Sequence, residues 1–453
     1  AACYCLTEPD AGSDANSGKT KAVLSADGTQ YLITGQKMWI SNAGFADLFI
    51  VFAKIEDDKN LTAFIVEKTF GGITMNEEEK KLGIKGSSTR QVFFNDCPVP
   101  VANMLSARGN GFKIAVNILN IGRVKLGAGV LGGARTVTTQ CIRYSAERKQ
   151  FGVSINTFGA IKAKLAEMAT RIYATESLCY RAGQDIEDRM GALAAQGLSD
   201  SEAKLKAMEQ FAIECAIAKV HGSEVLDYIV DQGVQIYGGM GYSADAPMER
   251  AYRDARISRI YEGTNEINRM LMVGMVLKRA MKGEINLFEP AMAVASELVS
   301  VPSFESIDTS ELFAMEKDLV HKLKKVFLMV GGKAAMALQD RIEDEQEIMM
   351  NLADVMIEIY AAESVLLRTE KLVSQRGEGA CGAQIAMSKI YLYEAIDKVE
   401  AAAKEAIVSF AKGDEQKVML MGLKRFTKPD FVNTKELRRQ VADVMIAEGK
   451  YPF

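Results

Sequence analysis

The stretch that decides the fold of this chain is Leu6-Thr7-Glu8-Pro9-Asp10-Ala11-Gly12-Ser13-Asp14. The residues that lead into it, from Ala1 to Thr7, have the composition of a strand interior, and the Asp, Gly and Ser that follow favour a turn. A strand that ends in such a loop is common on any protein surface. The complete nine-residue string is much rarer by chance, so its significance depends on the other motifs of the chain.

Residues 1–107 are predicted to form a small β domain. Apolar and polar residues alternate with period two in 30–34, and an apolar run at 48–53 indicates a buried strand. The domain is closed by Cys97-Pro98-Val99-Pro100, because proline cannot donate a hydrogen bond within a central ladder. Turn residues separate the strands at 26–28, 57–60 and 71–72.

Helical periodicity begins near residue 110. A helical bundle is predicted for 108–282, a connector with Pro290 and Pro302 for 283–308, and a second helical region for 309–453. The predicted fold class is therefore α+β and mainly helical. The expected helices lie at 111–146, 159–190, 201–238, 265–282, 309–337, 344–375, 381–411 and 433–448.

Composition argues against several classes of protein. The net charge is −4 with basic and acidic residues well mixed, which argues against a nucleic-acid binder. The seven cysteines show no paired spacing, so they indicate reduced thiols in a cytoplasmic, bacterial-type compartment or an equivalent reducing one. The two histidines, His221 and His321, lie far apart, so no metal site is expected. Neither a signal peptide nor a membrane-spanning stretch is expected.

Further strings stand downstream of residues 6–14, and one of them holds Trp39, the only tryptophan, close to Ser41. These strings are Gly35–Asn42, Glu147–Gly152, Val234–Tyr242 and Arg253–Ile267. In this order and spacing, the strings resemble the signatures of the acyl-CoA dehydrogenase family over roughly residues 1–282. The tail, with 344–347 and 352–354, resembles the very-long-chain branch of that family.

The resemblance implies a β-barrel-like middle domain, a helical bundle and a C-terminal helical extension. It implies FAD as cofactor and dehydrogenation of long-chain acyl-CoA to trans-2-enoyl-CoA in fatty acid β-oxidation, with electrons passed to an electron-transfer flavoprotein. A homodimer or homotetramer is expected, and membrane contact is not predicted. Family members carry a helical domain before the first signature, so we expect that part of the parent protein is missing here.

The same resemblance assigns the cofactor site. Trp39 would pack on the flavin ring, and Ser41 would bond near flavin N5. Arg148 would meet the diphosphate of a neighbouring subunit, because its planar fork suits phosphate oxygens. A carboxylate at Glu266 would be unfavourable near a diphosphate unless it is turned away. The expected FAD residues are Tyr4, Leu6, Thr7, Trp39, Ile40, Ser41, Arg148, Phe151, Gln235, Gly238, Gly239, Thr264 and Glu266.

Glu262 is the expected catalytic base. Removing the α-proton of a thioester needs a base with a raised pKa, and desolvation gives a carboxylate one. By resemblance, the Glu262 N–H and a ribityl hydroxyl hold the thioester oxygen. Some relatives place the base before an arginine on another helix, but here that position is Gly122. The expected substrate residues are Ser13, Asn120, Arg123, Tyr261 and Gly263.

One further motif is misleading, and two other interpretations of the chain stay open. Residues 127–132 match G-x-G-x-x-G but lack a preceding strand, so they indicate close helix packing rather than a dinucleotide site. The chain could be an acyl-CoA oxidase, in which oxygen reoxidises the flavin. It could also be a non-catalytic scaffold that binds a partner through its C-terminal helices, although the presence of Glu262 argues against that role.

Overall fold

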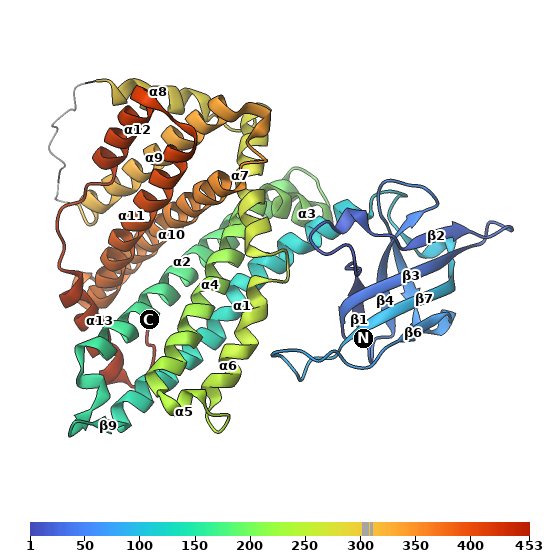
Figure 1. The fold of residues 1–453 in the computed structure, drawn as a ribbon, viewed down its shortest axis with the longest axis horizontal. Coiled ribbons are helices and arrows are strands. Elements are labelled where there is room, and N and C mark those ends of the chain that lie inside the picture. The colour runs from blue at the N-terminus through green and yellow to red at the C-terminus, as the bar shows by residue number, and fades with distance from the viewer. Residues whose placement is uncertain (301–307, 309–310) are drawn as a thin grey trace. The chain divides into compact units, whose positions relative to one another are not determined.

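The computed structural model of the chain describes residues 1–300, 308 and 311–453 (Figure 1). The chain divides into two compact units, Ala1–Gly122 and Arg123–Phe453, which we call the β unit and the helical unit. The predicted α+β, mainly helical fold class is confirmed.

The β unit is built on one sheet in the strand order β6-β7-β3-β2-β4-β5-β8, with β1 paired in parallel to β4. Side chains alternate between buried and exposed along β3, and its Ile33 packs with Phe49 and Phe94 in the core. The strands are β1 (Ala2–Cys5), β2 (Lys21–Leu24), β3 (Gln30–Ser41), β4 (Leu48–Ile55), β5 (Thr62–Glu67), β6 (Ile73–Met75), β7 (Thr89–Pro100) and β8 (Met104–Leu105).

The two prolines that we expected to close the domain lie inside β7. Pro98 and Pro100 pair with residues 32 and 30 of β3. On the other side of β7, β6 pairs only with residues 92–94. The prolines therefore stand where β7 has a neighbour on one side only, and a missing N–H can be accommodated there.

The helical unit carries most of the chain. Its first helix, α1, begins within the β unit. The helices are α1 (Gly111–Glu147), α2 (Gly159–Ala195), α3 (Asp200–Gln210), α4 (Ala212–Tyr237), α5 (Gly239–Tyr242), α6 (Pro247–Ala255), α7 (Asn265–Met281), α8 (Phe288–Leu298), α9 (Ala314–Leu338), α10 (Gln346–Arg376), α11 (Gly382–Phe410), α12 (Gly413–Phe426) and α13 (Thr434–Glu448), with a small hairpin of β9 (Lys149–Gln150) and β10 (Val153–Ser154).

The helices differ from the sequence prediction in four places. Helices α5 and α6 lie between the expected helices 201–238 and 265–282, where no helix was predicted. The expected helix 201–238 is two helices, α3 and α4, which meet at Phe211. A short helix, α8, lies within the predicted connector, and it tolerates Pro290 because that proline is in its first turn. Helix α12 begins at Gly413, and the sequence prediction contains no helix there. Residues 301–307 of the connector, with Pro302, lie outside the described residues.

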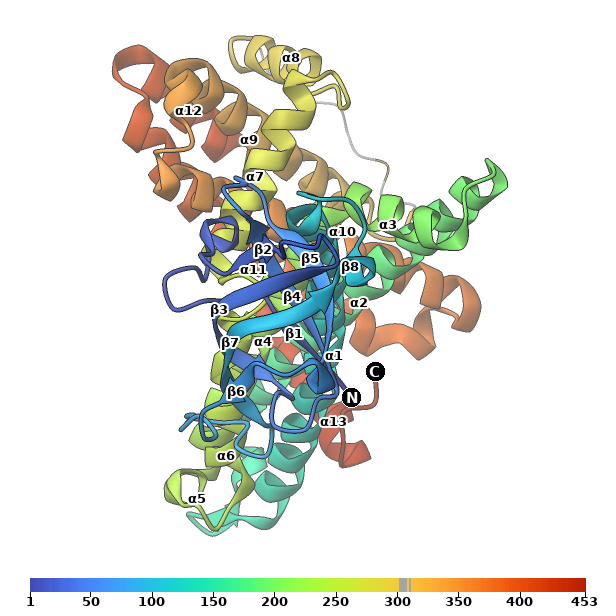
Figure 2. The same ribbon diagram turned by 90° about the vertical axis from the view of Figure 1, so that its right-hand side faces the viewer.

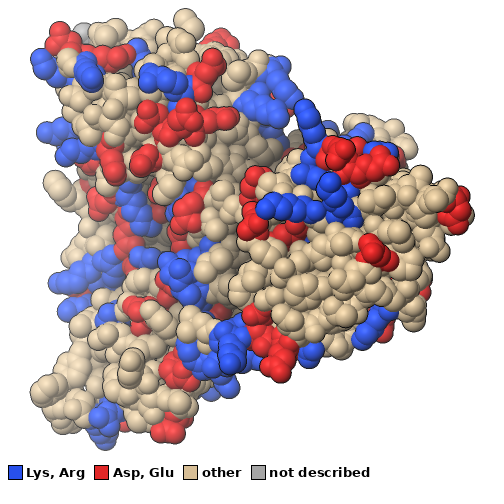
Figure 3. All heavy atoms as spheres, turned by 45° about the vertical axis from the view of Figure 1, so that its right-hand side comes forward, with Lys and Arg blue, Asp and Glu red and all other residues tan. Residues whose placement is uncertain are grey.

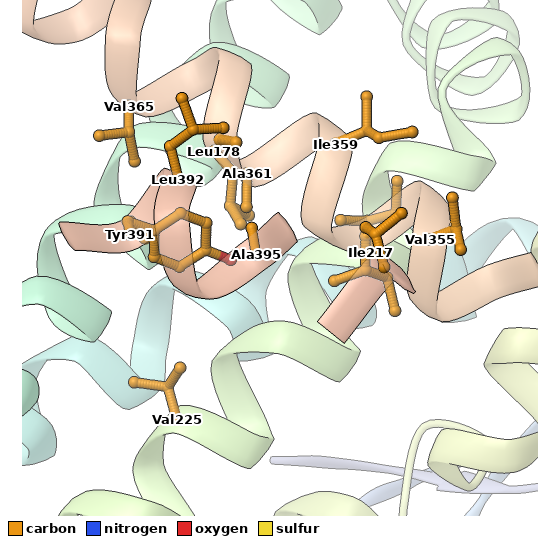
Figure 4. Close-up of a cluster of buried hydrophobic side chains, with 14 of the residues drawn as sticks. Leu178, Ile217, Val225, Val355, Ile359, Ala361, Val365, Tyr391, Leu392 and Ala395 are labelled. Atoms are coloured by element: carbon orange, nitrogen blue, oxygen red, sulfur yellow. The ribbon is translucent and has the colours of Figure 1, made fainter. Parts of the chain in front are cut away.

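One hydrophobic core runs through the helical unit from α1 to the C-terminus. In Figure 4, side chains from α2, α4, α10 and α11 converge, among them Leu178, Ile217, Ile359 and Leu392. Helices α8, α9 and α12 lie side by side in both ribbon views (Figure 1, Figure 2). The bundle and the C-terminal helices therefore bury their apolar faces against each other.

Helix α1 corrects one expectation and confirms another. It is long and apolar enough to cross a membrane, as core helices of soluble proteins also are, and 33% of its apolar 18-residue stretch is buried. The expectation that no stretch qualifies was too strict. A Cβ atom at Gly127 would meet the backbone oxygen of Ala218 at 2.6 Å, so this glycine allows α1 to pack closely on α4, as the interpretation of 127–132 predicted.

Charge is mixed on the surface. Lys and Arg side chains alternate with Asp and Glu over the face drawn in Figure 3. That face carries no large area of one sign, as the near-neutral net charge of −4 suggests.

Candidate active site

The loop after β1 is anchored by a buried ion pair. The Lys37 ammonium on β3 donates to Glu8 Oε1 at 2.6 Å, to Phe52 O at 2.7 Å and to Leu6 O at 3.2 Å. The side chain of Lys37 is fully buried and that of Glu8 is 6% exposed. The other Glu8 oxygen accepts from the backbone N–H of Lys19 at 2.6 Å. These contacts hold the carbonyl of Leu6 and the carboxylate of Glu8. Leu6 is one of the residues expected to meet the flavin.

The titration of this pair follows from its burial. Burial raises the pKa of Glu8, but Lys37 and the N–H donors more than offset it, so the pKa lies below its ordinary value. Burial lowers the pKa of Lys37, and Glu8 opposes that shift. A charged Glu8 is the form that these contacts favour.

Trp39 stands on a β-bulge close to this pair. The register between β3 and β7 shifts between Lys37 and Ile40, and Trp39 has φ of +60°, which is unusual for a bulky residue. The bulge leaves the indole 53% exposed, whereas the side chain of Ile40 is buried in the core. A strained, exposed aromatic residue marks a surface suited to a planar ligand, since such strain gathers at functional sites.

The other predicted residues of the β unit are distributed differently. Leu6 is buried, Tyr4 is half-buried with its ring edge against Phe52 at 5.1 Å, and Ser13 is exposed. The carbonyl of Thr7 accepts from the Met38 N–H at 2.9 Å, which ties the loop to the bulge. Ser41 is exposed at the end of β3, and Asn120 is buried in α1.

In the helical unit, Glu262 lies in a tight loop between a 3₁₀ turn (Arg256–Arg259) and α7. Glu262 has φ of +60° and Gly263 has φ of +76°. For a glutamate this left-handed conformation costs about 1–3 kcal/mol, so the surrounding contacts have to hold it. Thr264 then caps α7, because its hydroxyl accepts from the Ile267 N–H at 3.2 Å.

Three side chains hold the carbonyls of this loop. Arg123 Nε of α1 donates to Glu262 O at 3.2 Å, and Lys219 Nζ of α4 donates to Gly263 O at 2.7 Å. Asn268 Nδ2 of α7 lies 3.3 Å from Glu262 O and 2.9 Å from each of the carbonyls of Gly263 and Thr264. Sequence reasoning missed Lys219 and Asn268, and it also missed the pairing of Glu8 with Lys37, although those two stand inside quoted strings.

Electrostatics suit Glu262 for proton transfer. Burial raises the pKa of its half-buried carboxyl, and the positive charges of Arg123 and Lys219 lower it by less. A carboxylate with a raised pKa accepts a proton readily. Gly122 offers no competing carboxylate on α1. The pKa of Glu266 is lowered chiefly by its own backbone N–H, so this carboxylate is stabilised at the start of α7.

A second group of predicted residues gathers at the end of α1. Arg148 follows α1, and Phe151 and Gly152 form the tip of the β9–β10 hairpin with φ of +54° and +84°. Phe151 is 94% exposed. Tyr144 of α1 stacks on Tyr237 of α4 with ring centroids 4.0 Å apart, which joins this end to the residues after Tyr237.

Those residues form an open stretch of backbone. Gly238 has φ of +60°, and a Cβ atom at Gly238 or Gly239 would meet nothing within 4 Å. Gln235, one turn earlier, is exposed. Exposed backbone and an arginine at the same end of the bundle are groups that suit a phosphate. The rise of α1 from Arg123 to Arg148 is about 37 Å, so this group lies far from the Glu262 loop in the same helical unit.

Comparison with known proteins assigns these features to a family. The family model described as "Acyl-CoA dehydrogenase, middle domain" matches residues 3–97. Two family models described as "Acyl-CoA dehydrogenase, C-terminal domain" match residues 109–277 and 322–425. A probable acyl-CoA dehydrogenase of Bacillus subtilis is 44% identical over 450 residues, which cover 99% of this chain and 75% of that protein.

Two further matches extend the comparison. The very long-chain specific acyl-CoA dehydrogenase of rat mitochondria is 37% identical over 83% of this chain, which spans 58% of the rat protein. The crystal structure of an acyl-CoA dehydrogenase complexed with FAD from Bacillus anthracis has a TM-score of 0.96 and 43% identity, and the match covers 100% of this chain and 76% of that one. The family resemblance that the sequence strings indicated is confirmed.

Proposed function

The chain belongs to the acyl-CoA dehydrogenase family, and on that premise we propose that it dehydrogenates the acyl group of a long-chain acyl-CoA to the trans-2-enoyl-CoA. The observation that carries the proposal is the loop of Glu262. Its left-handed backbone is held by side-chain donors from three helices, and its half-buried carboxyl has a raised pKa.

The residues of the chain fit FAD as the cofactor. Trp39 offers an exposed aromatic face on a strained bulge, and Gly238 and Gly239 offer open backbone at the end of the bundle that carries Arg148. When bound, FAD supplies the acceptor for the hydride that leaves the β-carbon. Aromatic packing, open backbone and a guanidinium are the groups that a flavin ring and a diphosphate require.

Each residue then has a defined part in the proposed reaction. The Glu262 carboxylate removes the α-proton while its backbone N–H donates to the thioester oxygen and stabilises the charge that develops there. Tyr261 and Gly263 shape the substrate side of the loop. Arg123 holds the loop through Glu262 O and places a positive charge close to the substrate. Asn120 and Ser13 are proposed to contact the acyl-CoA.

Other properties remain proposals from the family. We propose fatty acid β-oxidation as the setting, an electron-transfer flavoprotein as the electron acceptor and a homodimer or homotetramer as the assembly. A long-chain substrate is supported by 37% identity to a very long-chain specific enzyme and by Gly122, since a residue without a side chain at that position would leave space for an acyl chain.

The test is anaerobic reduction of the purified flavoprotein by acyl-CoA, followed through flavin absorbance, in the parent and in Glu262→Gln. The substitution keeps the size of the side chain but removes the basic oxygen, so flavin reduction should slow by at least about a hundredfold while FAD content is unchanged. Glu284→Gln, which alters an exposed carboxylate after α7, is the matched control and should reduce at the parent rate.

Three outcomes would overturn parts of this proposal. Reduction of Glu262→Gln within a few-fold of the parent rate would show that the base is another group. Failure of every acyl-CoA to bleach the parent flavin would favour the non-catalytic scaffold. Rapid reoxidation when air is admitted to the reduced enzyme would favour the oxidase over the dehydrogenase.

A further inference from the structure

Lys219 is an ammonium group buried beside the loop of the proposed base. Its side chain is 0% exposed on α4, within the core of the helical unit. It donates to Gly263 O at 2.7 Å and to Asn265 Oδ1 at 2.7 Å, and both acceptors are uncharged. Burial of an ammonium is costly when its partners are neutral, so a purely structural role is poorly served by lysine at this position.

The hydrogen bonds of Lys219 show which parts of the loop it holds. Its bond to Gly263 O fixes the peptide that follows Glu262, and its bond to Asn265 fixes the first residue of α7. Asn265 is held in turn by Ser223 and Glu224 of α4. The left-handed pair Glu262–Gly263 is therefore clamped between α4 and α7 through the lysine.

We propose that Lys219 is a positioning residue for the proton abstraction: it clamps the Glu262–Gly263 turn and holds a positive charge beside that turn. This inference rests on the proposed role of Glu262 as the base. It assigns a function to a residue that does not touch the substrate.

The charges around the loop give the direction of the effect. Burial raises the pKa of Glu262, and Arg123 of α1 and Lys219 of α4 lower it, while Tyr261 lies in the same loop. The pKa of Lys219 is lowered to about 8, chiefly by burial and also by the charge of Arg123, and three carboxylates oppose the shift. Those carboxylates are Glu224 of α4, Glu266 of α7 and Glu262 itself.

Two variants separate the charge from the hydrogen bond. Lys219→Gln removes the charge and keeps a donor, whereas Asn268→Ala keeps the charge and removes a donor to Gly263 O, the carbonyl that Lys219 also holds. The rate of anaerobic flavin reduction by a long-chain acyl-CoA is measured for each between about pH 4.5 and 7.5, below the pKa of about 8 at which Lys219 itself loses its proton. Lys278→Gln, which removes an exposed positive charge from α7, is the control and should follow the parent profile.

In the parent, the rate should rise with pH as Glu262 loses its proton. In Lys219→Gln this inflection should move up by about one pH unit, because an opposing charge close to the carboxylate has gone. In Asn268→Ala the inflection should stay in place while the plateau rate falls. Where Lys219→Gln does not fold, Lys219→Met replaces it, since methionine fills the space of the lysine stem without an amide to satisfy.

An inflection in a folded Lys219 variant at the parent pH would overturn the inference, and so would an equal shift in Asn268→Ala. This failure differs from failure of the proposed function. If the parent does not reduce its flavin, or if Glu262→Gln reduces it normally, the base assignment falls. If the parent reduces its flavin and Glu262→Gln does not, the base assignment stands. An inflection that stays at the parent pH in the Lys219 variant then refutes only the proposed role of Lys219.

Discussion

Replacement of Lys37 by methionine should destabilise the β unit severely. The substitution keeps the length of the side chain and its apolar packing, but it removes the ammonium from a site with no exposure. Glu8 then stays buried without its cation, and the carbonyls of Leu6 and Phe52 lose a donor.

The structure sets the size of the effect. Removing one partner of a buried ion pair costs about 3–5 kcal/mol. Glu8 keeps the N–H donors of Lys19 and Thr20, so a cost near the lower end, about 3 kcal/mol, is expected. Domains are stable by only about 5–15 kcal/mol, so the midpoint of unfolding should move clearly.

The pH dependence follows from the sign of the shift. The pKa of Glu8 is lowered in the folded chain, so its contribution to stability is present above its ordinary value of about 4.3 and is lost as the pH falls through the lowered pKa. In Lys37→Met burial acts on Glu8 without the opposing ammonium, so its carboxyl protonates more easily. The difference between variant and parent should therefore be large at pH 7 and smaller near pH 4.

Urea unfolding followed by the fluorescence of Trp39 measures this effect. The single tryptophan lies on β3, two residues from Lys37, so it reports the β unit, while far-ultraviolet circular dichroism reports mainly the helices.

Lys19→Met, which breaks an exposed pair with Asp10, is the control and should barely move the midpoint. The double variant Glu8→Gln/Lys37→Met should be more stable than Lys37→Met. If Lys37→Met moves the midpoint no further than Lys19→Met, the buried pair does not anchor the loop.

Further predictions address other parts of the chain. Arg148→Ala should lose FAD and also lower the mass measured by light scattering, and retention of both would argue against a site shared between subunits. Burial lowers the pKa of His221 to about 3, so stability should fall as the pH drops below about 6.5, by up to about 1.4 kcal/mol per pH unit. His221→Gln should remove this dependence of stability on pH. A substitution at the exposed His321 is the control and should leave the dependence unchanged. Long-chain acyl-CoA should bleach the flavin faster than butyryl-CoA because Gly122 leaves room, and a clear preference for the four-carbon substrate would contradict that expectation.

Local patterns were sufficient for most of the fold. The alternation in 30–34 and the apolar run at 48–53 lie in β3 and β4, and the helical period recovered α1, α2, α7 and α10 within a few residues at each end. The prediction failed where a local signal was outweighed by context. Pro98 and Pro100 fit in β7 because β6 is short, and Pro290 fits in α8 because it stands in the first turn.

The candidate site likewise contains residues that local sequence predicts and residues that it misses. The family, the cofactor and Glu262 follow from strings of neighbouring residues, because the chemistry of a signature is written within a few positions of the chain. Lys219 stands 44 residues before the carbonyl that it holds, and Lys37 stands 29 residues after Glu8. Both are lysines that a sequence pattern assigns to the surface, since isolated ammonium groups are rarely buried.

By itself, then, the sequence determined the order of the β domain and the helical regions, the family and the identity of the proposed base. The tertiary structure decided which charges are removed from water and which oxygens they meet. Periodicity specifies the face of a helix or strand that is buried, but the partner of a buried charge depends on how α1, α4 and α7 pack, and on how the fold brings Lys37 of β3 to the Phe52 carbonyl of β4. Those contacts join distant parts of the chain, so only the folded chain brings Arg123, Lys219 and Asn268 to one loop.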